Sequence, residues 1–223
     1  MAQPIGALSL HIDGARKLSA ALVADLEQAC DRAEDGAAAG LLTLHVTGVP
    51  GEDWARGLTI GLVTKWERTL RRLERLPVTT VAAAAGDLGG AALDAFLAAD
   101  VRLIAPGARL LLSSDGGATW PGMAGFRLVQ HAGVAGARRA VLFGAPILAD
   151  EAIRLGIADR FVDGEQDVPA AAAALVGEVA GREVAIRRQL MFEAVTTSFE
   201  EALGSRLAAC DRALRRAEAE AAA

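Results

Sequence analysis

The segment from Ala82 to Asp100, AAAAGDLGGAALDAFLAAD, constrains the fold of this chain more than any other stretch. The short apolar run over 78–84 predicts a buried strand. The glycines that follow predict a turn over 85–90, and the apolar stretch beyond it predicts a helix over 91–98. A strand that leads directly into a helix is the repeating unit of α/β proteins, whose sites lie where strands end and helices begin.

Strand and helix patterns alternate through about residue 162. Alternating and short apolar runs predict further strands, and apolar residues spaced by three and four predict further helices. The strands are expected over 7–12, 41–46, 101–105, 109–112 and at Val162, and the helices after Ser19 and over 62–76, 122–131, 135–142 and 149–155.

The chain after Pro169 contains no strand pattern. It predicts helices over 170–180, 183–195 and 199–216, the last with Ser198 and Glu201 as a capping box. We therefore expect an α/β core over 1–165 and an all-helical region over 166–223. Apolar stripes along the last two helices predict an oligomerisation surface, formed by Ile186, Leu190, Phe192, Val195, Leu203, Leu207, Cys210 and Leu214.

Charge and composition exclude several classes of protein. Of the 223 residues 52% are hydrophobic, which is enough for a full core without disulfides or metal. The net charge of −5 argues against binding to nucleic acid or to anionic membranes, both of which require a basic face. The two cysteines and three histidines lack metal-ligand spacing. With no leader-like start and no apolar run long enough to span a membrane, the expected compartment is the cytoplasm.

The predicted junction at Gly89 and Gly90 can do chemistry with its backbone. Amides in the first turn of a helix have no intrahelical acceptor and lie at the positive end of the helix dipole, so they stabilise an anion or a developing oxyanion. The spacing fits neither a dinucleotide-binding GxGxxG motif nor a P-loop. The alternative is that the glycines serve only tight packing of helix against strand.

Five motifs follow one another along the chain: GDLGGAALD (86–94), DVRLI (100–104), WPGM (120–123), LFGAPI (142–147) and ADEAIRLGIAD (149–159). In this order they resemble the enoyl-CoA hydratase/isomerase (crotonase) superfamily, over roughly residues 8–215. The resemblance implies an α/β fold built as a spiral of ββα units, with C-terminal helices that assemble homotrimers or dimers of trimers. It also implies a lyase that stabilises the enolate of an acyl-CoA thioester.

Within the superfamily, TWPGM (119–123), RRAVLFGAP (138–146) and TTSFEEAL (196–203) resemble the small hydratase-like proteins of dihydroxyphenylglycine biosynthesis in glycopeptide-antibiotic pathways. This implies dehydration and aromatisation of a polyketide acyl-CoA toward 3,5-dihydroxyphenylacetyl-CoA, alongside a type III polyketide synthase. The substrate is carried as a CoA thioester, and no separate cofactor is implied. Two alternatives are a non-catalytic partner that enhances the synthase, and a hydratase or isomerase of fatty acyl-CoA.

Carried over residue by residue, the resemblance assigns one oxyanion amide to Gly90 or Ala91, with Ala91 favoured. The second amide falls on Ala55, although the family's signature around that position is absent. Asp94 stands where many hydratases keep the first of two catalytic glutamates. An apolar helix face would raise the pKa of this carboxyl and make it a better proton carrier, the alternative being a solvated or capping aspartate.

The position of the second glutamate holds Ser114, followed by Asp115. A shift of one residue would restore a carboxylate pair with Asp115, but the surrounding SSDGG is also an ordinary turn sequence. Trp54 and Trp120 are expected as packing residues or walls of the substrate pocket. Arg187 and Arg188 are expected on a solvated helix face, with CoA phosphate binding as the alternative.

Overall fold

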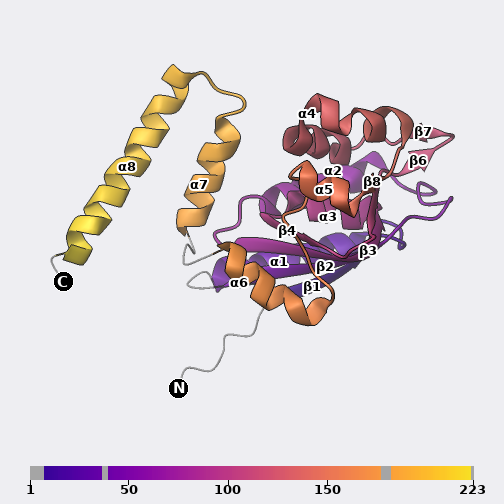
Figure 1. The fold of residues 1–223 in the computed structure, drawn as a ribbon, viewed down its shortest axis with the longest axis horizontal. Coiled ribbons are helices and arrows are strands. Elements are labelled where there is room, and N and C mark those ends of the chain that lie inside the picture. The colour runs from indigo at the N-terminus through magenta and orange to yellow at the C-terminus, as the bar shows by residue number, and fades with distance from the viewer. Residues whose placement is uncertain (1–7, 37–39, 177–181, 222–223) are drawn as a thin grey trace.

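The computed structural model describes residues 8–36, 40–176 and 182–221. A parallel sheet of β1 (Leu8–Asp13), β2 (Leu41–Gly48), β3 (Thr79–Gly89), β4 (Val101–Ile104) and β9 (Arg160–Phe161), in that spatial order, forms its centre. Figure 1 shows helices on both faces of this sheet. The remaining strands are β5 (Arg109–Leu111), which pairs with β3, β8 (Ile147–Leu148), which pairs with β5, and a hairpin of β6 (Ser114–Asp115) and β7 (Ala118–Thr119).

The described part of the chain contains eight α-helices. They are α1 (Ala20–Asp35), α2 (Ile60–Leu73), α3 (Gly90–Ala98), α4 (Met123–Phe143), α5 (Ala149–Arg154), α6 (Val168–Val176), α7 (Arg182–Glu193) and α8 (Phe199–Ala221), with a 3₁₀ turn at Glu165–Asp167. The Ser19 hydroxyl accepts a hydrogen bond from the Leu22 amide at the start of α1, as predicted. Gly133 breaks α4 with φ of 68°, so two predicted helices meet end to end.

The side chains of β3 alternate between two buried clusters on opposite faces of the sheet. Ala82 and Ala84 belong to the larger buried cluster, which α1, α2 and α3 also line. Val81 and Ala83 belong to a smaller cluster on the other face, which Val168 of α6 covers. Because successive residues of a strand point to opposite faces, one alanine-rich strand serves both layers.

The predicted turn over 85–90 is wrong, because β3 continues through it. The register between β2 and β3 shifts after Val46, so that Gly48 lies opposite Leu88. Beyond the shift, Leu88 and Gly89 pair with β5 instead of β4. The irregularity is a bulge that redirects the strand, and α3 begins only at Gly90.

Backbones at the carboxyl ends of β1, β2 and β3 pack closer than side chains allow. A Cβ atom added to Gly14 would lie 2.3 Å from the Gly89 carbonyl oxygen and 2.4 Å from that of Gly48. At Gly90, whose φ is +51°, a Cβ would lie 2.7 Å from Cγ of Pro50. These glycines permit a close approach of strand ends at one point of the fold.

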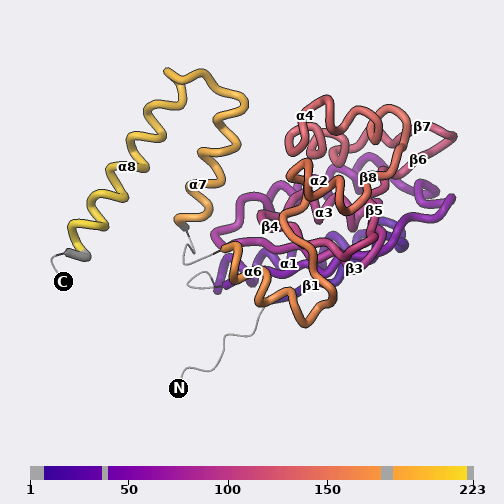
Figure 2. Tube along the Cα trace, viewed as in Figure 1, coloured from indigo at the N-terminus to yellow at the C-terminus, as the bar shows by residue number. Residues whose placement is uncertain are grey.

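The helical region predicted from residue 166 begins with α6 on the sheet, and only α7 and α8 project away from the core as a hairpin (Figure 2). Residues 177–181 and 222–223 of that prediction lie outside the described residues. Ser198 and Glu201 form the predicted capping box, since each backbone amide donates to the other side chain.

Arg188 fastens α7 to the core, contrary to the prediction of a solvated face. Its side chain is 4% exposed and its guanidinium pairs with Asp100, with Nε to Oδ1 at 2.6 Å. It also donates to the carbonyl oxygens of Leu76 at 2.7 Å and Val78 at 2.9 Å. Arg187 lies on the exposed side and pairs with Glu183.

We expect Arg188→Ala to destabilise the protein by about 3–5 kcal/mol, because it leaves Asp100 and two buried carbonyl groups without their donor. Arg187→Ala, the matched control, removes an exposed pair and should cost less than about 1 kcal/mol. Urea unfolding of both variants measures the difference. Equal stabilities would contradict the role of Arg188 as the fastening point.

We expect Gly14→Ala to cost about 1–3 kcal/mol, because a methyl group there forces the ends of β2 and β3 apart. Gly51→Ala is the control, since a Cβ at Gly51 has no neighbour within 4 Å among the described residues. Its effect should stay within about 0.5 kcal/mol. Thermal and urea unfolding of the two variants provide the comparison, and a neutral Gly14→Ala would show that the strand ends have room to move.

Candidate active site

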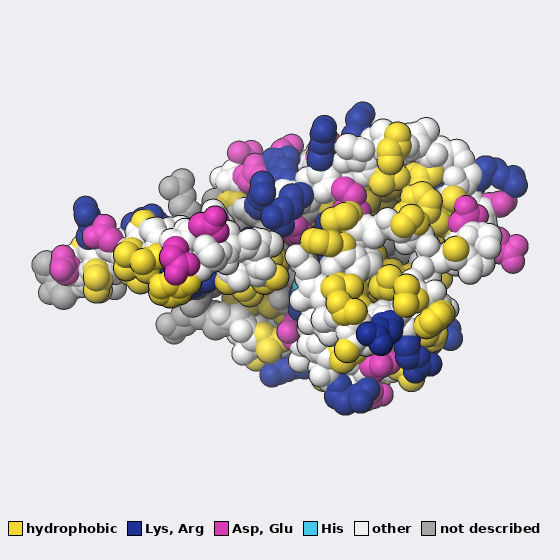
Figure 3. Space-filling view, turned by 90° about the horizontal axis from the view of Figure 1, so that it is seen from above, with side chains coloured by type: hydrophobic (Ala, Val, Ile, Leu, Met, Phe, Trp, Pro, Cys, Tyr) yellow, Lys and Arg dark blue, Asp and Glu magenta, His cyan; other side chains and the backbone are white. Residues whose placement is uncertain are grey.

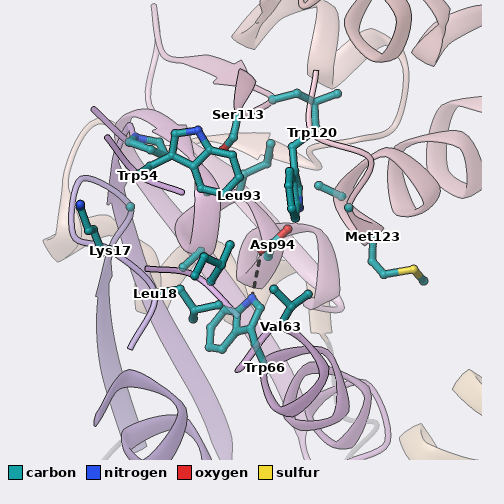
Figure 4. Close-up of a pocket in the computed structure, with 18 of the residues that line it drawn as sticks. Lys17, Leu18, Trp54, Val63, Trp66, Leu93, Asp94, Ser113, Trp120 and Met123 are labelled. Carbon is teal, nitrogen blue, oxygen red and sulfur yellow. Dashed lines mark hydrogen bonds between the residues drawn. The ribbon is translucent and has the colours of Figure 1, made fainter. Parts of the chain in front are cut away.

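A pocket opens beside the glycine contact, between the N-terminus of α3 and one face of α2 (Figure 4). Gly90, Ala91 and Asp94 of α3 line it. The opposite wall is formed by α2, and the rim by the loops that follow β1, β2 and β5. These other lining residues include Gly14, Arg16, Lys17, Leu18, Pro50, Trp54, Leu58, Val63, Trp66, Glu67, Leu112, Ser113, Trp120, Gly122 and Met123.

The N-terminus of α3 brings backbone amides to the pocket. Gly90 is the first residue of the helix, and Gly89 before it makes no side-chain cap. The first-turn amides of Gly90 and Ala91 therefore have no intrahelical acceptor and lie at the positive end of the helix dipole. Both residues line the pocket, so this wall can stabilise a negatively charged oxygen.

Asp94 lies one turn further along α3 and its carboxyl group faces the same pocket (Figure 4). It neither caps a helix nor lies in open solvent. Oδ2 accepts a hydrogen bond from Nε1 of Trp66 at 3.0 Å. Burial, with the charge of Glu67 as a smaller cause, raises the pKa of Asp94 from 3.8 to about 7. A carboxyl group with this pKa can both give and take a proton near neutral pH.

Two tryptophans form an aromatic wall. Trp54 and Trp120 meet edge to face, with ring centroids 5.1 Å apart and an interplanar angle of 86°. Nε1 of Trp54 donates to the Ser114 carbonyl oxygen at 2.8 Å, which fixes its ring. Both residues line the pocket, and their faces can contact a flat, apolar group.

Three predicted site residues lie elsewhere. Ala55 is in the loop before α2 and is not among the residues that line the pocket. Ser114 and Asp115 form strand β6, where both are exposed and outside the pocket lining. The local turn chemistry of SSDGG produces a hairpin that carries these side chains away, and Ser113 is the last residue of the segment to line the pocket.

Sequence reasoning missed Glu67. Val63, Trp66 and Glu67 are spaced by three and four residues on α2, so they share the face that lines the pocket. The available signal was the position of Glu67 beside Trp66, at the edge of an apolar stripe. A charged residue at such a position is usually solvated, and only the packing of α2 against α3 brings it to Asp94.

Within residues 8–36, 40–176 and 182–221, no group of three or more His, Cys, Asp or Glu side chains is placed to hold a metal ion. In that same part of the chain no helix combines the length and the apolar character needed to cross a membrane.

Solved structures share this architecture. An enoyl-CoA hydratase/isomerase from Marinobacter aquaeolei superimposes with a TM-score of 0.78 and 19% identity, covering 93% of this chain and 87% of the other. An enoyl-CoA hydratase from Bacillus anthracis gives a TM-score of 0.75 and 22% identity, covering 94% and 88%. The fold is therefore crotonase-like.

The sequence comparisons define the family. The enoyl-CoA hydratase/isomerase model matches residues 52–221. An enoyl-CoA-hydratase of Amycolatopsis orientalis is 54% identical over 211 residues, which is 95% of this chain and 97% of that protein. A probable enoyl-CoA hydratase of Bacillus subtilis is 26% identical over 90% of this chain and 83% of its own length. The chain belongs to the enoyl-CoA hydratase/isomerase family, and the prediction of a hydratase-type lyase is confirmed at that level.

The raised pKa of Asp94 predicts how stability depends on pH. Between about pH 4 and pH 7 the folded protein holds a proton on Asp94 that the unfolded chain has lost, so stability falls as pH rises through this window. The slope from this group should approach about 1.4 kcal/mol per pH unit. Asp94→Asn should remove it.

Urea unfolding at pH 5 and pH 8 measures the effect. Asp25→Asn, on the exposed side of α1, is the control for loss of an aspartate. If Asp94→Asn and Asp25→Asn show the same change in stability between the two pH values, the raised pKa of Asp94 is contradicted.

Proposed function

We propose that this protein is a hydratase-like lyase that dehydrates and aromatises a polyketide acyl-CoA toward 3,5-dihydroxyphenylacetyl-CoA. The single observation that carries the proposal is that Gly90 and Ala91, in the first turn of α3, and Asp94 line one pocket. Loss of water next to a thioester passes through an enolate, which requires a donor for the carbonyl oxygen and a group that moves protons.

The amide of Ala91 is the preferred oxyanion donor. It belongs to the second residue of α3, so its N–H has no acceptor within the helix and points along the helix axis toward the N-terminal end. A preorganised donor of this kind contributes about 2.7–4 kcal/mol to stabilisation of the transition state. Asp94 then supplies the proton that the departing hydroxyl group needs to leave as water.

The walls of the pocket support an aromatic product. Trp54 and Trp120 offer ring faces to a flat, conjugated group. Among the described residues the indole N–H of Trp120 has no acceptor. This donor can therefore bind a hydroxyl group of the substrate. Arg16 and Lys17 bring positive charge to the rim, where the phosphates of the CoA carrier would emerge.

A homo-oligomer, a homotrimer or a dimer of trimers, belongs to the same proposal. Apolar side chains along α8 stand exposed, with Leu207 at 58% and Leu214 at 65%. Figure 3 shows hydrophobic side chains on the projecting α7–α8 hairpin at its left. Burial of such a surface between copies of the chain would stabilise the hairpin away from the core.

Ala91→Pro tests the oxyanion assignment. Proline is tolerated in the first turn of a helix and has no N–H, so the substitution removes the proposed donor. We expect it to lower the rate of 3,5-dihydroxyphenylacetyl-CoA formation about 10²- to 10³-fold, in an assay with a purified type III polyketide synthase and malonyl-CoA. Ala91→Gly keeps the amide and should retain the rate.

Asp94→Asn in the same assay tests the proton carrier and should lower the rate about 10²- to 10⁴-fold. Circular dichroism establishes that each variant is folded. If folded Ala91→Pro and Asp94→Asn both enhance product formation as the wild type does, the enzymatic role is overturned and a non-catalytic partner of the synthase is the remaining function.

A further inference from the structure

The pocket contains a second carboxylate that the family motifs do not assign. Glu67 lines it from α2, across from Asp94 on α3, and the two carboxyl groups are close enough for the charge of one to raise the pKa of the other. The side chain of Glu67 is 21% exposed, so it is largely withdrawn from solvent yet open to the pocket. The position expected for a second carboxylate, Ser114 or Asp115, lies on the exposed hairpin instead.

Arg127 of α4 holds Glu67 in place. Nη1 of Arg127 donates to Oε2 of Glu67 at 2.9 Å, and Nε donates to Oε1 of Glu74 at 2.8 Å. Glu67 of α2 and Glu74, the C-cap of the same helix, lie two turns apart, so one guanidinium bridges both. The Arg127 side chain is only 6% exposed, and its positive charge is therefore little screened by water.

The two carboxyl groups have different partners. Asp94 receives a hydrogen bond from a neutral indole, whereas Glu67 is paired with a full positive charge. Burial raises the pKa of both groups. At Glu67 the charge and hydrogen bond of Arg127 oppose the rise in pKa, whereas at Asp94 the hydrogen bond of Trp66 opposes it, with the charge of Arg127 as a smaller cause. Carboxyl groups whose surroundings differ in this way commonly divide the roles of acid and base.

We propose that Glu67 is the second catalytic carboxylate of this site and acts as the base that complements Asp94. This assignment rests on the proposed function. The carboxylate of Glu67 takes a proton from the carbon next to the thioester, and the electron pair of the broken C–H bond moves onto the carbonyl oxygen, which the α3 amides stabilise.

The enolate then re-forms the carbonyl group while the bond from the β-carbon to its hydroxyl group breaks. The hydroxyl takes the proton of Asp94 and leaves as water. The substrate loses one molecule of water and no electrons are gained or lost overall. Glu67 ends protonated and Asp94 ionised, and transfer of one proton between them through the pocket restores the starting state.

Hydrogen exchange tests the first step alone. Phenylacetyl-CoA carries acidic protons next to its thioester but no hydroxyl group to lose, so in D₂O the base step appears as deuterium uptake by mass spectrometry. We expect the wild type to bind this thioester and catalyse exchange. Glu67→Gln should bind it with similar affinity in calorimetry but exchange about 10²- to 10⁴-fold more slowly.

Two further variants separate chemistry from structure. Glu67→Asp keeps a carboxylate at shorter reach and should exchange faster than Glu67→Gln. Glu34→Gln removes a carboxylate of α1 that pairs with Arg72, on the side of α2 that faces α1. It should exchange at the wild-type rate. Thermal unfolding of each variant establishes that it is folded.

The outcomes distinguish the two proposals. If the wild type exchanges and folded Glu67→Gln exchanges equally fast, the assignment of Glu67 is overturned while the proposed function stands. If Glu67→Asp is no faster than Glu67→Gln, a bridging role toward Arg127 replaces the catalytic one. If the wild type neither binds phenylacetyl-CoA nor exchanges its protons, the proposed function fails and the assignment fails with it.

Discussion

Direct contact between the backbones of three strand ends determines the rest of this structure. Gly14 follows β1, and Gly48 and Gly89 end β2 and β3; the carbonyl groups of Gly48 and Gly89 leave no room for a Cβ at Gly14. This contact fixes where β3 stops, and therefore where α3 begins and where its first amides point. The pocket is thus a consequence of packing in the sheet, and the wall formed by the first turn of α3 requires no side chain at Gly90.

Local signals predicted most of the elements but not the course of β3. Caps such as Ser19 and the break at Gly133 are encoded within a few residues, so the helices could be placed from the sequence. The glycines over 85–90 carry an equally local turn signal, which was misleading. Their conformation is set by pairing with β2 and β5, and a bulge between distant strands has no signature in the segment itself.

The residues of the candidate site also differ in whether a local sequence pattern could predict them. Gly90, Ala91 and Asp94 lie within the first two turns of one helix, so a single motif predicted all three. Glu67 comes from a different helix and becomes part of the site only when α2 packs on α3. Arg102, a motif residue outside the pocket, has a structural role, since it donates to the carbonyl oxygens of Ala99 and Ile157. Similarity to a family therefore does not by itself separate fold from chemistry.

The contacts of Arg188 connect α7 to segments of the core that come much earlier in the chain. Its guanidinium donates to the carbonyl oxygens of Leu76 and Val78 and to the carboxylate of Asp100. These three residues lie at least 88 positions earlier in the chain. A ribosome-bound chain that has not yet released α7 therefore leaves the segment between α2 and β3 unsatisfied. Vectorial synthesis would therefore leave the connection between α2 and β3 loosely held until α7 has emerged and Arg188 can bind it.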